Sequence, residues 1–229
     1  MYPFLKVLYS KPNQAMSNLL TLKVKLQSAH LPIWRTIKID SSLSFLDFHH
    51  VLQAAIGWQN EHLFQFEIMQ GTKETQETIR ISDPEFLEDD SILDAKTVKL
   101  SSFLTAKGKV LEYIYDFGDY WQHRIELTDI EPQAEEKVMA QCVAGKSACP
   151  PEDCGGVYGY QDLVEAIADP KNKEHADLLD WLGLEKASDF DAKAFNVADA
   201  NKAVQKYFSQ KTKKNQSSAN KNFMFSWLF

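Results

Sequence analysis

The first regular pattern in the chain is an alternation of apolar and polar residues over Leu20–Leu26. Because every second residue is apolar, the pattern predicts a strand with one buried face. Pro32 cannot donate a hydrogen bond to a sheet, so we expect the next strand to begin after it. Arg35 shares one face of that second strand with Ile37 and Ile39. A guanidinium on this face would be buried and would need a carboxylate partner.

The pattern then changes to the three- and four-residue spacing of an amphipathic helix. Ser44 is suited to cap the start of this helix and Gly57 its end. The apolar stripe consists of Phe45, Phe48, His49, Leu52, Ala55 and Ile56. A single histidine on such a stripe is usually a hydrogen-bonded core residue. His49 becomes a candidate ligand only if His62 and His123 converge with it.

Strand patterns return in the middle of the chain. We expect His62–Met69 to form a strand that pairs with Thr78–Ile81. Pro84–Asp94 carries five acidic residues and no base, which is typical of a solvated acidic loop. Val138–Val143 is expected to form a last strand at the edge of the sheet.

A predicted hairpin around Gly118 joins Lys109–Asp116 to Trp121–Ile130. On its second strand the apolar positions alternate regularly with polar ones. Trp121 and His123 fall on the apolar face, so we expect both to point into the core or into a cleft within it.

The last third of the chain predicts a loop followed by helices. The loop spans Gly145–Gly159, and Pro170 should end the first helix because it disfavours helical geometry at Asp169. The expected helices are Tyr160–Ala168, Glu174–Leu182 and Val197–Phe208. Strands followed by helices indicate an α+β fold rather than a wound βαβ sheet.

This order of elements predicts one domain with two tails. Residues 1–18 form a lead-in, residues 19–144 the sheet part, residues 145–209 the loop and helical part, and residues 210–229 a flexible tail. Within that tail Lys211–Asn222 has four lysines and no acid, so we expect it to be disordered. The apolar residues after it either dock on the body, bind a partner or mark an unusual terminus.

Composition narrows the class of protein. The chain has 229 residues, which is enough for one large domain or two small ones and a substantial core. A net charge of −7 and a pI near 5.4 disfavour broad electrostatic binding to nucleic acid. The sequence has no apolar run near the ~20 residues of a membrane helix and no signal-peptide pattern. We therefore expect a cytoplasmic protein with no membrane segment.

The three cysteines are candidates for a zinc site. An odd number of cysteines suits reduced thiols or metal ligands better than a disulfide framework. Cys142, Cys149 and Cys154 have C-x6-C-x4-C spacing, which lacks the paired C-x2-C units of a zinc ribbon. With His62 or His123 they could still complete a tetrahedral site. The alternative is a Gly/Pro-rich loop with half-buried cysteines.

Acidic residues near the hairpin form a second candidate site. Carboxylates hold a hard cation and an imidazole moves a proton, which is the chemistry of a hydrolytic metal site. The candidate catalytic residues are Asp116, Asp119, His123, Glu152 and Asp153. The favoured alternative is structural, because aspartate is a common turn residue and Asp116 could be the partner of Arg35.

Aromatic and polar residues around the hairpin suggest a ligand surface. Trp34, Trp58, Tyr113, Tyr115 and Trp121 could stack against a base or a sugar, although such rings more often form the core. The candidate ligand-binding residues are Trp34, Arg35, His49, Trp58, Tyr115 and Trp121.

Four separated motifs together resemble the root-inducing-plasmid open-reading-frame-three-like family, of which some members are carried by plasmids and insertion elements. The motifs are Pro32–Arg35, the His49 helix ending in Gly57-Trp58 with His62-Leu63 after it, Tyr115–Asp119 with Trp121 and His123, and Cys142–Tyr160. The Asp169-Pro170 step, Phe190-Asp191 and Phe195 also fit. Phe64 stands near a position where the family often has a further histidine.

The resemblance implies an α+β domain with a mixed, mainly antiparallel sheet flanked by helices, and no established biochemical activity. The leading hypothesis is a soluble, non-catalytic binding or interaction domain whose partner is an unknown protein or small-molecule ligand. No phosphate loop, dinucleotide fingerprint or nucleophile elbow is present in the sequence. The alternative is a metal-dependent hydrolase or nuclease that uses Asp116, Asp119 and His123. A nucleic-acid binder with the lysine-rich tail as an arm is disfavoured by the acidic body.

Overall fold

The computed structural model describes residues 17–72, 75–83 and 91–225. Within these residues eight strands form one sheet in the order β5-β4-β3-β6-β7-β1-β2-β8. Neighbouring strands are antiparallel except β4 and β5, which are parallel. The strands are β1 (Asn18–Leu26), β2 (Trp34–Asp40), β3 (Phe64–Gln70), β4 (Glu77–Ser82), β5 (Leu93–Asp94), β6 (Val110–Tyr115), β7 (Trp121–Pro132) and β8 (Ala140–Lys146).

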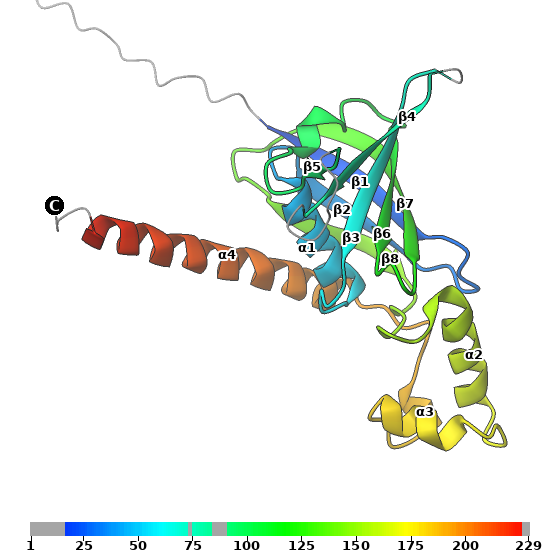
Figure 1. The fold of residues 1–229 in the computed structure, drawn as a ribbon. Coiled ribbons are helices and arrows are strands. Elements are labelled where there is room, and N and C mark those ends of the chain that lie inside the picture. The colour runs from blue at the N-terminus through cyan, green and yellow to red at the C-terminus, as the bar shows by residue number, and fades with distance from the viewer. Residues whose placement is uncertain (1–16, 73–74, 84–90, 226–229) are drawn as a thin grey trace, which may run out of the picture.

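The helices complete the fold and confirm the α+β prediction. They are α1 (Phe45–Ile56), α2 (Gly156–Ala168), α3 (His175–Trp181) and α4 (Val197–Phe225). Figure 1 shows α1 against the sheet, α4 running beside α1, and α2 with α3 beyond one end of the strands. None of the helices in the described part of the chain combines the length and the apolar character that crossing a membrane requires.

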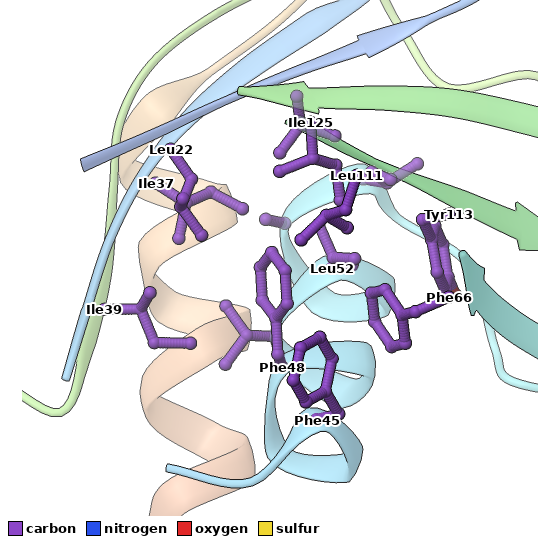
Figure 2. Close-up of a cluster of buried hydrophobic side chains, with 14 of the residues drawn as sticks. Leu22, Ile37, Ile39, Phe45, Phe48, Leu52, Phe66, Leu111, Tyr113 and Ile125 are labelled. Atoms are coloured by element: carbon purple, nitrogen blue, oxygen red, sulfur yellow. The ribbon is translucent and has the colours of Figure 1, made fainter. Parts of the chain in front are cut away.

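Helix α1 forms where its capping residues predict. The Ser44 hydroxyl accepts a hydrogen bond from the Asp47 amide, and the Asp47 carboxylate accepts one from the Ser44 amide, which is a capping box. Gly57 ends the helix in the left-handed conformation, with φ of 119°. The buried face of α1 brings Phe45 and Phe48 against Phe66 of β3, with ring centroids 5.1 and 5.5 Å apart. Figure 2 shows these rings meeting aliphatic side chains from the strands.

Arg35 is buried as predicted, but the prediction that it pairs with a carboxylate was wrong. Its Nε donates to the Ala55 carbonyl at 2.9 Å, and Nη1 donates to the carbonyls of Trp34 and Lys146, each at 2.9 Å. The guanidinium also lies over the Phe195 ring, 4.1 Å from its centroid. The positive charge therefore caps the C-terminal end of α1, where helix carbonyls lack partners within the helix.

Helix α4 extends further than the sequence predicts. We expected a helix over Val197–Phe208 and a flexible segment after it, whereas the helix continues to Phe225. This stretch contains neither glycine nor proline, so nothing in the backbone interrupts the helix. Two contacts also hold α4 on α1: the Tyr207 hydroxyl donates to Asp47 Oδ1 at 2.7 Å, and Lys211 donates to the same carboxylate.

The strand boundaries differ in detail from the predictions. The predicted hairpin is confirmed as β6 and β7, and β4 pairs with β3 as expected. β3 begins at Phe64, so His62 lies in the loop before it. β8 is shifted towards the C-terminus relative to Val138–Val143 and lies at the edge beside β2, where the Asn201 side chain pairs with the backbone of Cys142. Most of the lead-in and of the acidic loop, residues 1–16 and 84–90, lies outside the described residues.

Candidate functional site

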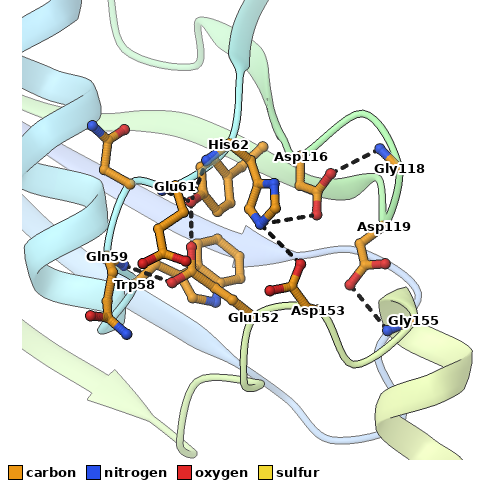
Figure 3. A network of polar contacts seen from close by, with 12 residues as sticks. Trp58, Gln59, Glu61, His62, Asp116, Gly118, Asp119, Glu152, Asp153 and Gly155 are labelled. Atoms are coloured by element: carbon orange, nitrogen blue, oxygen red, sulfur yellow. Dashed lines mark hydrogen bonds and ion pairs between the residues drawn. The ribbon is translucent and has the colours of Figure 1, made fainter.

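Three ionisable side chains from separate loops converge beside the hairpin. His62 precedes β3, Asp116 follows β6, and Asp153 lies between β8 and α2. His62 Nε2 is 3.1 Å from Asp153 Oδ1 and 3.7 Å from Asp116 Oδ2. Figure 3 shows the imidazole pointing between the two carboxylates. Each of the three side chains offers one potential metal-ligand atom, and these atoms all lie within 4.8 Å of one another.

The turn that holds Asp116 leaves one of its oxygens available. Asp116 adopts a left-handed backbone with φ of 58°, and its carbonyl accepts a hydrogen bond from the Tyr120 amide at 2.7 Å. Its Oδ1 accepts from the Gly118 amide at 2.9 Å, which is the turn role expected for aspartate. The second oxygen, Oδ2, faces His62. Asp116 therefore shapes the turn and also contributes to the cluster.

Glu152 fixes the loop that carries Asp153. One oxygen of the Glu152 carboxylate accepts from the Tyr115 hydroxyl, and the other accepts from the Gln59 amide at 2.9 Å. The Trp58 indole donates to the Pro150 carbonyl at 3.0 Å and ties the same loop to the end of α1. Both Glu152 oxygens are thus occupied. Glu152 is a positioning residue for its neighbour Asp153, which has φ of 60°.

Asp119 connects the hairpin to the start of α2. Its Oδ2 accepts a hydrogen bond from the Gly155 amide at 3.1 Å. The next residue, Gly156, passes so close to the hairpin that a Cβ there would lie 2.5 Å from the Asp119 carbonyl oxygen. The loop carrying Asp153 therefore depends on a glycine at this crossing.

Replacement of Gly156 with alanine is expected to lower the free energy of unfolding by roughly 2–3 kcal/mol, because the added methyl group overlaps the hairpin backbone and φ is +68°. Gly183→Ala is the matched control, since Gly183 has φ of +65° but open space around it. The control should cost only about 1 kcal/mol. Urea unfolding of both variants measures the difference, and equal losses would show that the close approach is unimportant.

A pocket of about 600 Å³ opens beside the cluster. His62 and Asp116 form part of its wall, and His49 and Asn60 form another part. Its remaining lining residues are Leu46, His50, Glu61, Leu63, Phe64, Ser82, Asp83, Phe117 and Gly118. Eight of the thirteen lining residues are polar or ionisable, and they lie beside the apolar side chains of Leu46, Leu63, Phe64 and Phe117.

His49 is a neutral, fully hydrogen-bonded residue of the pocket wall. Its Nδ1 lies 2.8 Å from the Tyr113 hydroxyl, and its Nε2 contacts Asn60 Oδ1. Its ring stacks on Phe64 with centroids 3.7 Å apart. Burial lowers the pKa of His49 to about 3, so the imidazole is uncharged at neutral pH.

The other predicted ligand-binding residues lie outside the pocket wall. Trp58, Tyr115 and Trp121 are buried and contact one another in the core, with Trp58 stacked on Tyr115 at 4.8 Å. Trp34 is half-buried, and Lys23 Nζ lies 3.4 Å from the centre of its ring. Arg35 is bound to carbonyls. None of these residues is among those that line the pocket.

His123 lies in the core, so the apolar face of the hairpin points into the core at this position and not into a cleft. It is 2% exposed, its Nδ1 donates to the Trp121 carbonyl at 3.0 Å, and its ring contacts the edge of Trp58. Of the predicted catalytic residues, only Asp116 and Asp153 meet. Asp119, His123 and Glu152 are held by other partners.

The cysteines are not assembled with a histidine in the described part of the chain. Cys142 is buried in β8, and its thiol lies 3.6 Å from the Ala144 carbonyl oxygen. Burial raises the pKa of Cys142 and Cys149, and burial followed by the Asp119 charge raises the pKa of Cys154 to about 12. In the metal-free protein all three side chains are thus protonated thiols.

Several residues of the pocket were not among the sequence candidates. Asn60, Glu61, Ser82, Asp83 and Phe117 carry no motif that marks them as ligands. The available signal was position: Asn60 and Glu61 lie between the glycine that ends α1 and the candidate residue His62. A loop in that place could have been predicted to face the site.

The fold and the site define a class: an α+β domain with a pocket between its first helix and its sheet, and a His/Asp/Asp cluster at the pocket wall. The chain belongs to the plasmid pRiA4b ORF-3-like protein family, whose family model matches residues 18–199. This confirms the resemblance identified in the sequence.

Two relatives extend this comparison. The chain is 36% identical over 191 residues to the uncharacterized protein y4hQ of Sinorhizobium fredii, which covers 82% of this chain and 92% of the relative. It also resembles the crystal structure of MM3350, a protein of unknown function from Methanosarcina mazei Go1. That structure has 34% identity and a TM-score of 0.68, and the match covers 80% of this chain and 98% of the other.

Proposed function

We propose that this protein is a ligand-binding domain in which His62, Asp116 and Asp153 hold a divalent cation that anchors a ligand in the adjacent pocket. The observation that carries the proposal is the convergence of one imidazole nitrogen and two carboxylate oxygens within 4.8 Å of one another. Metal–ligand bonds to such atoms are about 2.0–2.2 Å long, so one ion can reach all three after small side-chain adjustments.

The chemistry of the three side chains indicates the kind of cation. One imidazole with two carboxylates suits Zn²⁺, Mn²⁺ or Fe²⁺ better than Ca²⁺, which prefers oxygen ligands alone. The two carboxylates balance the charge of a divalent ion. Three protein ligands leave at least one coordination position open, and since His62 and Asp116 line the pocket, a ligand there could occupy it.

The two residues that the sequence suggested as a catalytic base do not support hydrolysis at this cluster. A hydrolase that uses the hairpin region would need a base near the cluster, and the sequence candidates for that role were His123 and Glu152. His123 is buried among aromatic rings, and both oxygens of Glu152 accept hydrogen bonds from Tyr115 and Gln59. Neither side chain is placed to activate a bound water molecule.

Asp116→Asn is the sharpest test of the cation site. The amide oxygen can still accept the hydrogen bond from Gly118, so the turn should remain, while a ligand charge is lost. We expect the affinity for Mn²⁺ and Zn²⁺ to fall by roughly 10- to 100-fold, as measured by calorimetric titration of dialysed protein. His62→Ala should give a loss at least as large.

His30→Ala is the matched control, because His30 is exposed in the loop between β1 and β2 and lies outside the cluster. It should bind the ions as the unsubstituted protein does. If the unsubstituted protein binds neither ion, or if Asp116→Asn binds both unchanged, the proposed site is wrong.

A further inference from the structure

We infer that the pocket selects a ligand with two oxygen-bearing groups, one for the cation and one that accepts a hydrogen bond from the Asn60 side chain. This rests on the proposed function, since the first group needs the cation. The second group follows from a chain of hydrogen bonds behind the pocket wall. That chain determines which end of the Asn60 amide is available to a ligand.

The chain of hydrogen bonds begins at the backbone amide of Asn60, which can act only as a donor. The Asn60 amide N–H can only donate, and it lies 3.0 Å from Gln53 Oε1. The oxygen of the Gln53 side chain therefore faces Asn60, and its Nε2 must be the end that faces Tyr113. Gln53 Nε2 donates to the Tyr113 hydroxyl at 3.0 Å. The Tyr113 oxygen is thus an acceptor in this contact.

The hydroxyl of Tyr113 determines which ring nitrogen of His49 carries the hydrogen. Its side chain is fully buried, so its hydroxyl hydrogen needs an acceptor within the protein. In the described structure the remaining partner of the hydroxyl is His49 Nδ1, at 2.8 Å. Nδ1 must therefore be unprotonated, and a neutral His49 carries its hydrogen on Nε2.

The last step reaches the pocket. The Nε2–H of His49 donates to Asn60 Oδ1, which uses the oxygen of the Asn60 amide. The two N–H groups on Asn60 Nδ2 donate to no acceptor among the described residues, and Asn60 lines the same pocket as His62 and Asp116. At Asn60 the pocket wall therefore presents a hydrogen-bond donor to a ligand.

The surroundings hold this arrangement in place. Gln53, Tyr113 and His49 are all buried, and His49 is stacked on Phe64 with its ring plane tilted by 11°. Asn60 has φ of 62°, a left-handed conformation that asparagine tolerates better than most residues. Reversing the amide would place its N–H groups against the N–H of His49, so the donor at Asn60 cannot readily become an acceptor.

Carboxylate and carbonyl oxygens satisfy both ends of this site. They bind divalent cations, and they accept hydrogen bonds from amide N–H groups. The inferred ligand class is therefore a small molecule with a carboxylate or carbonyl group at each end. Succinate, glutarate and adipate are suitable probes, because they differ in the spacing between two carboxylates. Acetate reaches the cation alone and serves as the single-group control.

The first experiment tests the hydrogen-bond chain without any ligand. Two-bond ¹H–¹⁵N correlation spectra of ¹⁵N-labelled protein distinguish the tautomers of histidine. We expect His49 to carry its hydrogen on Nε2, and His49→Gln identifies its signals. The opposite tautomer would overturn the inference whatever the protein does with metal ions.

The second experiment measures binding of the probes to the Mn²⁺-loaded protein by the paramagnetic relaxation of their protons. In Asn60→Asp the side chain still accepts from His49 but no longer donates to the pocket. At least one dicarboxylate should bind about tenfold or more weakly to this variant, whereas acetate binding should change little. Gln59→Glu adds the same charge one residue away and should leave dicarboxylate binding unchanged.

The outcomes separate the two proposals. Failure of the unsubstituted protein to bind Mn²⁺ would overturn the proposed function and the ligand inference together. Retained Mn²⁺ binding with equal dicarboxylate affinity in Asn60→Asp and the unsubstituted protein would overturn the ligand inference alone. An equal loss in Gln59→Glu would assign the effect to charge and would also overturn it.

Discussion

Replacing Arg35 with alanine is expected to lower the free energy of unfolding by roughly 3–5 kcal/mol. The guanidinium is 2% exposed and donates to the carbonyls of Ala55, Trp34 and Lys146. Truncation leaves these carbonyls without their donor, opens a cavity beside Phe195 and removes the positive charge at the end of α1. In a domain of this size the loss corresponds to a fall in melting temperature of about 10 °C or more.

Arg35→Lys separates charge from geometry. Lysine keeps the positive charge, but one ammonium group cannot reproduce the fork that reaches α1, β2 and β8 together. We expect it to recover less than half of the loss. Asp116→Asn, which leaves these contacts intact, should change the melting temperature far less. A melting temperature for Arg35→Ala within a degree or two of that of the unsubstituted protein would refute the capping role.

Acid is expected to destabilise the fold already at pH values well above the pKa range of ordinary carboxylates, because two histidines are buried in the neutral form. Burial lowers the pKa of His49 to about 3 and that of His123 to about 4. An unfolded histidine has a pKa of about 6.5, so the unfolded chain binds more protons below that pH. The stabilisation is complete above pH 6.5 and is lost as the pH falls towards 4 and then 3.

Each group contributes a slope of about 1.4 kcal/mol per pH unit in this window, and the two together about 2–3 kcal/mol per unit between roughly pH 6 and 4. Urea unfolding at a series of pH values measures this slope. His123→Asn keeps a donor for the Trp121 carbonyl but does not titrate. Its slope should be smaller by about 1.4 kcal/mol per unit, although its stability at neutral pH will also be lower. His30→Ala should leave the slope unchanged, and equal slopes in all three proteins would contradict the prediction.

Much of the fold could be predicted from the sequence because its signals are local. The capping residues Ser44 and Gly57 define α1, and alternation defines β1 and β7. The partner of Arg35 was not predictable in this way, since the carbonyl of Ala55 becomes a partner only once α1 is packed across β2. The extension of α4 beyond Phe208 likewise depends partly on a contact with Asp47, which is distant in sequence.

The candidate site was predicted in its parts but not in its grouping. Asp116 and Asp153 were identified as acidic candidates and His62 as a metal ligand, yet they were assigned to different hypothetical sites. Alternation correctly placed His123 inward, but it could not tell whether Trp58 would cover it. The strand order decides which loops lie together at the end of the sheet. The sequence predicts the hairpin of β6 and β7, but it does not reveal that β3 pairs with β6.

The position of β1 in the sheet has a consequence for how the protein folds during synthesis. The first strand lies between β2 and β7, so one of its two edges pairs with Trp121–Pro132, a segment about one hundred residues later in the chain. Until β7 has left the ribosome, an emerging β1–β2 hairpin exposes an open edge with alternating apolar residues. Such long-range pairing makes folding slow and leaves the growing chain open to aggregation or to capture by chaperones.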